Sequence, residues 1–112
     1  IGFKTANILV SNKNKLIPAN GVYAVKVCVN EEDYFGMMNI GRRPTIENPD
    51  AGISIEVHIF NFDEEIYNKV LTVKFIKRVR DERKFDSIEA LKEQLRVDKN
   101  DIIQFFNQAD EY

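Results

Sequence analysis

The chain has 112 residues, of which 44% are hydrophobic, 30% charged and 11% aromatic, a composition that excludes a disordered chain and suits one folded core. We therefore expect a single domain over residues 1–112. The formal net charge of −2 offers no general attraction to a nucleic-acid backbone, so we predict no nucleic-acid partner.

Short β-branched and aromatic runs, separated by turn-forming residues, fill the chain from its start to about residue 80. No segment between two runs has a sustained helical period, which argues against parallel βαβ units. The pattern is typical of an antiparallel sheet or barrel. It predicts five strands, at residues 6–10, 21–29, 34–40, 53–62 and 70–79.

Beyond residue 80 the apolar period changes from two to about 3.6, which indicates helix. Asp86 and Glu89 have the spacing of a capping box, so a first helix is expected to begin there. Asp98 and Asp101 repeat that start signal before a second apolar patch. We therefore predict two C-terminal helices, and a mainly β fold class overall.

The predicted strand at residues 53–62 places Glu56 and His58 on one face, because side chains alternate along a strand. A carboxylate beside an imidazole could act as a general base. A strand with one dry and one wet face explains the same alternation, and alternation alone favours that explanation. No second histidine and no spaced cysteines accompany His58, so we predict no histidine metal site.

The chain has no apolar run near the roughly 20 residues that a membrane-spanning helix needs. Its single cysteine, Cys28, cannot form an internal disulfide. We therefore expect a cytoplasmic protein without a membrane partner. Two basic clusters, at residues 42–43 and 77–84, are most simply an exposed loop and a solvated strand end. The glycine-rich phosphate and dinucleotide motifs are absent from the sequence.

Six segments in sequence order carry a more specific pattern, and the likeness that they support extends over nearly the whole chain. They are residues 2–8 (GFKTANI), 21–25 (GVYAV), 39–45 (NIGRRPT), 55–60 (IEVHIF), 66–69 (IYNK) and 79–87 (VRDERKFDS). In order and spacing they resemble the motifs of riboflavin kinases, the module that forms the C-terminal half of bacterial bifunctional FAD synthetases.

This resemblance implies a six-stranded antiparallel, Greek-key-like barrel followed by a C-terminal helix, which agrees with strands followed by helices. It also implies an enzyme that transfers the γ-phosphate of ATP to the ribityl 5′-hydroxyl of riboflavin, giving FMN and ADP. ATP and riboflavin are then the substrates, and Mg²⁺ or another divalent cation is required.

The resemblance assigns roles to four residues by their position in the motifs. Thr5 and Asn7 match the threonine and asparagine that hold the cation and the ATP phosphates. Glu56 matches the general base. Arg80 is a weaker candidate for binding, in the segment that borders the flavin cleft in this family.

The chain also departs from the family pattern. Lys4 stands where the first motif has proline, so the fixed φ before Thr5 is lost and a cation is placed near the phosphate site. Asn68 replaces a glycine, a mild change because asparagine tolerates positive φ. The family has a strand and a glycine-rich loop before the first motif. We therefore expect this chain to be part of a longer protein that supplies the sixth strand and carries an N-terminal FMN adenylyltransferase domain.

Two other functions are compatible with the sequence. A flavin-binding module of the same fold, impaired in catalysis by Lys4, would bind riboflavin or FMN without consuming ATP. A small barrel could bind single-stranded nucleic acid through Phe35, Phe60 and Phe62, although the negative net charge disfavours it. ATP consumption separates the first from a kinase, and a salt-dependent oligonucleotide titration tests the second.

Overall fold

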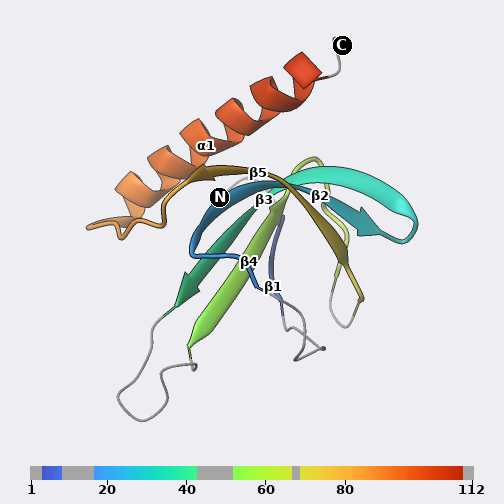
Figure 1. Ribbon diagram of the computed structural model, residues 1–112, viewed down its shortest axis with the longest axis horizontal. Helices are drawn as coiled ribbons and strands as arrows, with labels where there is room; N and C mark the ends of the chain where they lie inside the picture. Colours follow the sequence, from blue (N-terminus) through green and yellow to red (C-terminus); the bar gives the residue numbers. More distant parts are fainter. Residues whose placement is uncertain (1–3, 9–16, 43–51, 67–68, 110–112) are drawn as a thin grey trace. The chain divides into compact units, whose positions relative to one another are not determined.

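The structure is a computed structural model, and it describes residues 4–8, 17–42, 52–66 and 69–109 (Figure 1). Strands precede one helix along the chain, so the predicted mainly β fold class is confirmed. The elements are β1 (Lys4–Asn7), β2 (Gly21–Val29), β3 (Glu32–Arg42), β4 (Ile53–Ile59), β5 (Thr72–Arg80) and α1 (Ile88–Ala109).

The chain divides into two compact units. The described residues up to Glu82 form one unit, which holds the five strands, and the described residues from Arg83 onward form the other, which holds α1. The expectation of a single domain stays a prediction. In the described part of the chain, no helix combines the length and apolarity needed to cross a membrane.

All five described strands belong to one sheet, in the order β1-β4-β3-β2-β5, and every neighbouring pair is antiparallel. The five predicted strands are therefore present, with ends that differ by a few residues. Two register shifts between β2 and β5 mark irregular pairing, and both strands bend strongly in Figure 1, as expected where pairing is bulged. Barrel closure and the sixth strand stay predictions.

The turn between β2 and β3 is as tight as a hairpin allows. Val29 pairs with Glu32, which leaves Asn30 and Glu31 as the only loop residues. Both have positive φ, 51° and 70°, the left-handed conformation that a two-residue type I′ turn requires at its two central positions.

One face of the sheet forms the hydrophobic core. Alternate residues of three strands supply it, because alternation puts every second side chain on the same face. The buried members are Tyr23, Val25, Val27 and Val29 of β2, Met38 and Ile40 of β3, Ile55, Val57 and Ile59 of β4, and Phe62, which follows β4. The predicted alternation of β4 is confirmed by Ile55, Val57 and Ile59, whereas Ile53 at its start is 40% exposed.

The prediction of two C-terminal helices is wrong, because α1 continues without a break for 22 residues. Asp98 does not cap a second helix. Its side chain is buried and its Oδ1 accepts a hydrogen bond from Gln94 Nε2 (2.9 Å), one turn earlier in α1. Ser87, and not Asp86, caps the start, since the Ala90 backbone N–H donates to Ser87 Oγ (3.1 Å).

Candidate functional site

The candidate site lies on the face of β4 that points away from the hydrophobic core. Glu56 and His58 share this face, as predicted, because Ile55 and Val57 on either side of Glu56 belong to the core. Glu56 is half-buried, and His58 is only 4% exposed. A carboxylate and an imidazole therefore sit side by side in a sheltered part of the sheet.

Burial controls the charge of His58. Desolvation lowers the pKa of its imidazole from 6.5 to about 4, so the side chain is neutral at pH 7. A neutral imidazole leaves the negative charge of a neighbouring carboxylate uncompensated. His58 is thus a buried neutral group beside Glu56, not a cation paired with it.

The pairing of β1 with β4 brings three of the predicted site residues together. Asn7 is in register with Glu56, and Thr5 is in register with His58. Directly opposite residues of an antiparallel pair have Cβ atoms about 4.5–5.5 Å apart. The backbone positions predicted to hold the cation therefore lie next to the position predicted to act as the base.

On its other side β4 pairs with β3, which adds a residue that the sequence analysis did not single out. Asn39 is in register with Glu56, and Met37 with His58. The signal was present in the sequence, since Asn39 is the polar residue between the core residues Met38 and Ile40. Asn39 begins one of the six motif segments, but only the strand register shows that it lies beside Glu56.

Arg80 lies on β5, at the far edge of the sheet, and belongs to the same row as Glu56, meaning the residues that are in register with one another across neighbouring strands. Asn39 is in register with Val22 on β2, and Val22 with Arg80 on β5. Three strand spacings therefore separate Arg80 from Glu56, about 14 Å measured along the sheet. Arg80 lies in the same row as Glu56, but at the opposite side of the sheet from β1.

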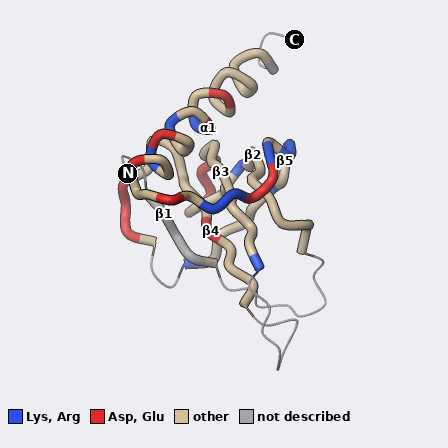
Figure 2. The backbone as a smooth tube through the Cα atoms, turned by 90° about the vertical axis from the view of Figure 1, so that its left-hand side faces the viewer, with Lys and Arg blue, Asp and Glu red and all other residues tan. Residues whose placement is uncertain are grey.

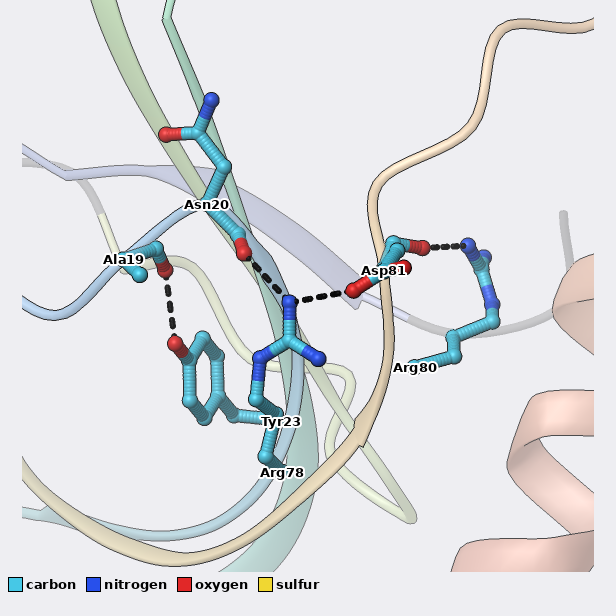
Figure 3. Close-up of polar contacts among 6 residues, drawn as sticks. All are labelled: Ala19, Asn20, Tyr23, Arg78, Arg80 and Asp81. Carbon is cyan, nitrogen blue, oxygen red and sulfur yellow. Dashed lines mark hydrogen bonds and ion pairs between the residues drawn. The ribbon is translucent and has the colours of Figure 1, made fainter.

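The end of β5 is held by a small polar cluster (Figure 3). Arg78 Nη2 donates hydrogen bonds to the Asn20 carbonyl oxygen (2.8 Å) and to Asp81 Oδ1 (2.7 Å). Arg80 Nη1 donates to the Asp81 carbonyl oxygen (2.9 Å). Tyr23 contributes its hydroxyl, which donates to the carbonyl oxygen of Ala19 (2.6 Å).

The basic clusters fit the simpler interpretation made from the sequence. Arg78 and Asp81 form an exposed ion pair at the strand end, and the basic residues of β5 are followed directly by acidic ones (Figure 2). Arg42 donates to Asn20 Oδ1 and to the Pro18 carbonyl oxygen, which anchors the end of β3. Arg43, the other residue of the cluster at 42–43, lies outside the described residues, as do the Lys4 side chain and Asn68.

The aromatic platform suggested for single-stranded nucleic acid is not present as proposed. Phe60 and Phe62 are 3% and 6% exposed, and the Phe62 ring packs edge-on against Tyr34 with centroids 4.9 Å apart. Buried rings cannot stack on bases, so only Phe35, at 37% exposed, retains an accessible face.

Comparisons with known proteins identify one family and support the fold. The Flavokinase family, described as riboflavin kinase, matches residues 1–106. The bifunctional riboflavin kinase/FMN adenylyltransferase of Bacillus subtilis (strain 168) is 44% identical over 108 residues, which cover 96% of this chain and 34% of that protein. The RNA-binding riboflavin kinase RibR of the same organism is 35% identical over 98 residues, covering 88% of this chain and 41% of that protein.

A solved structure matches as well. The macrolide-efflux protein from Streptococcus pneumoniae has a TM-score of 0.81 and 34% identity, over 88% of this chain and 32% of that one. The chain therefore spans only about a third of the length of this protein and of the bifunctional relative.

Proposed function

The chain belongs to the riboflavin kinase family, and from this we propose that it transfers the γ-phosphate of ATP to the 5′-hydroxyl of riboflavin, giving FMN and ADP. The observation that carries the proposal beyond the family match is the pairing of β1 with β4. It sets Asn7 opposite Glu56, and this proximity supports the proposal that one position binds phosphate and the other supplies the base.

Glu56 is proposed as the general base. Its carboxylate accepts the proton of the riboflavin 5′-hydroxyl while that oxygen bonds to the γ-phosphorus and the bond to the ADP oxygen breaks. Phosphoryl transfer depends mainly on positioning and on charge neutralisation, so a fixed base on a rigid strand suits the reaction. A general base accepts a proton as a negatively charged carboxylate. Because His58 is neutral, it does not offset that charge on Glu56.

Thr5 and Asn7 are proposed to hold Mg²⁺ or another divalent cation together with the ATP phosphates. The groups available at these two positions are a hydroxyl and an amide oxygen, and Mg²⁺ binds oxygen ligands. Among the described residues no group of three or more His, Cys, Asp or Glu side chains gathers, and Mg²⁺ in kinases characteristically takes few protein ligands besides phosphates and water. When bound, the cation would neutralise charge on the phosphates.

Arg80 is proposed as a binding residue and not as a catalytic one. At about 14 Å from Glu56 along the same row, it is placed for the far end of an extended substrate. Its guanidinium already donates to the Asp81 carbonyl oxygen, which orients it at the end of β5.

We further propose that the native protein joins this chain to an FMN adenylyltransferase domain. The support is the name of the bifunctional relative and the third of its length that the chain spans. RNA binding belongs to the name of one relative, and the net charge of −2 gives no support for it here. A cytoplasmic location is proposed because the single Cys28 cannot form an internal disulfide.

The test is Glu56→Gln in the full-length protein, because glutamine keeps the size of the side chain and removes the base. We expect kcat for FMN formation to fall by about 10²-fold or more, with an unchanged melting temperature. Ser54→Ala is the matched control, since Ser54 lies on the same face of β4 with an exposed side chain and should keep the wild-type rate.

An unchanged kcat in Glu56→Gln would remove Glu56 from the base role. A wild-type protein that binds riboflavin without consuming ATP would refute the kinase and favour a flavin-binding module.

A further inference from the structure

The segment that follows β5 brings a second carboxylate to the face of the sheet that carries Glu56. A Cβ atom at Gly41 would lie 2.6 Å from Glu82 Oε1 and 3.1 Å from Glu82 Oε2. Gly41 follows the core residue Ile40 on β3, so a side chain at position 41 would point to the face opposite the core. Cβ atoms essentially never approach a neighbour closer than 3.0 Å, so the glycine is what leaves room for the Glu82 carboxylate.

Glu82 and Glu56 are close enough to contact one small molecule. Gly41 is in register with Ser54 on β4, and Glu56 is two residues further along that strand on the same face. Diagonal neighbours of this kind are about 7–8 Å apart across an antiparallel pair. The two carboxylate positions are therefore separated by the length of a short carbon chain.

Glu82 is held in place but is not enclosed. It is half-buried, so part of it stays accessible to a ligand, whereas the residues directly before and after it are exposed. The backbone that leads to it is anchored, because Arg80 Nη1 donates to the Asp81 carbonyl oxygen (2.9 Å) and Arg78 Nη2 donates to Asp81 Oδ1 (2.7 Å) (Figure 3). Its carboxylate is thus an accessible acceptor on the face of the candidate site.

Charge decides which substrate this carboxylate suits. An ionised carboxylate only accepts hydrogen bonds, and it repels the phosphates of ATP. The positions proposed for the cation and the phosphates, Thr5 and Asn7, lie on β1, whereas Glu82 lies over β3, on the other side of β4. Riboflavin is uncharged, and several neighbouring carbons of its ribityl chain each carry an O–H donor. Glu82 therefore suits the hydroxylated, uncharged substrate and not the nucleotide.

We infer that the Glu82 carboxylate accepts hydrogen bonds from hydroxyl groups of the riboflavin ribityl chain, further along that chain than the 5′-hydroxyl whose proton Glu56 takes. The inference rests on the proposed function. It makes Glu82 a specificity-determining residue, because a site that provides an acceptor for a substrate hydroxyl discriminates against an analogue without that hydroxyl. Gly41 contributes by leaving room for the carboxylate.

The test uses Glu82→Ala in the full-length protein. We expect KM and Kd for riboflavin to rise about 10- to 100-fold, the effect of losing hydrogen bonds to a charged group, while KM for ATP is unchanged. Lumiflavin, which has the isoalloxazine ring with a methyl group in place of the ribityl chain, isolates the hydroxyl contact. Its Kd, measured by flavin fluorescence, should be the same in wild type and variant. Glu64→Ala, which removes an exposed carboxylate after β4, is the matched control and should change neither Kd.

Gly41→Ala tests the same contact without removing the carboxylate. Its methyl group would lie 2.6 Å from Glu82 Oε1, so the carboxylate has to move, and the riboflavin Kd should rise about 2- to 10-fold. In the double variant with Glu82→Ala, the Gly41→Ala change should have no further effect, since the group that it displaces is gone. If Glu82→Ala does not fold, Glu82→Met, which keeps the length of the side chain, is measured in its place.

Equal losses of affinity for riboflavin and lumiflavin would overturn the inference, as would an unchanged riboflavin Kd in Glu82→Ala. A riboflavin Kd that Gly41→Ala raises equally with and without the Glu82 carboxylate would also overturn it. Absence of FMN formation by the wild type refutes the proposed function instead, and the riboflavin and lumiflavin titrations still decide the role of Glu82.

Discussion

Lowering the pH from 7 to 5 is expected to destabilise this protein through one side chain, His58. The imidazole is 4% exposed, and its burial lowers its pKa from 6.5 to about 4. The unfolded chain, in which the pKa returns to 6.5, therefore binds a proton more readily than the folded chain at every pH between these two values.

The sign follows from proton linkage. Where the unfolded state binds more protons, the free energy of unfolding rises with pH. The stability associated with a neutral His58 is thus present above pH 6.5, is lost progressively as the pH falls from 6.5 to 4, and is gone below pH 4. A difference of about 2.5 pKa units corresponds to about 3 kcal/mol in total, of which about 2 kcal/mol is lost between pH 7 and pH 5.

His58 is the only histidine in the chain, so an NMR titration of its imidazole signal gives the folded pKa without any assignment problem. Urea unfolding at pH 7 and pH 5, with EDTA present to exclude cation binding, gives the free energies. His58→Gln is the control, because it cannot titrate while every carboxylate remains. The wild type should lose about 2 kcal/mol more than the variant between the two pH values.

A folded pKa near 6.5 would refute the reasoning, and so would an equal pH dependence of stability in the wild type and in His58→Gln. Either result would mean that water reaches the imidazole in the folded protein.

Three further substitutions test the cation site and the close packing of β3. Asn7→Ala should weaken ATP binding about 10-fold or more in calorimetric titrations with Mg²⁺ and little without it, whereas an equal loss in both conditions would indicate a folding defect. Gly36→Ala should lower the free energy of unfolding in urea by about 1–3 kcal/mol, because its Cβ would lie 2.6 Å from the backbone oxygen of His58. In Gly41→Ala the contact at 2.6 Å is with the end of the flexible Glu82 side chain, so a loss as large as that of Gly36→Ala would contradict this explanation.

The approximate positions of the five strands and the two faces of β4 could be predicted from the sequence alone. In β4 the alternation of apolar and polar residues follows directly from the burial of one face, so Val57 could be assigned to the core and Glu56 to the other face without coordinates. The six motifs also pointed to the riboflavin kinase family, which the comparisons show.

The capping patterns in the sequence did not predict the extent of the helix. Asp98 has the sequence context of a cap, and nothing nearby in the chain excludes that role. In the structure its carboxylate is buried within α1 and satisfied by Gln94, so the helix continues through it. Capping patterns describe short stretches of chain, whereas burial depends on everything that surrounds the residue.

Which residues share the candidate site could not be predicted from the sequence, because it depends on how the strands pair. Asn7, Glu56 and Asn39 come from three different strands and meet because β4 pairs with β1 on one side and β3 on the other. Register is set by the hydrogen bonding of whole strands, and a slip of one residue would turn Glu56 toward the core. The same pairing buries His58 and leaves Asn39 Oδ1 unpaired among the described residues, two properties that depend on neighbours across the sheet and not on neighbours in the sequence.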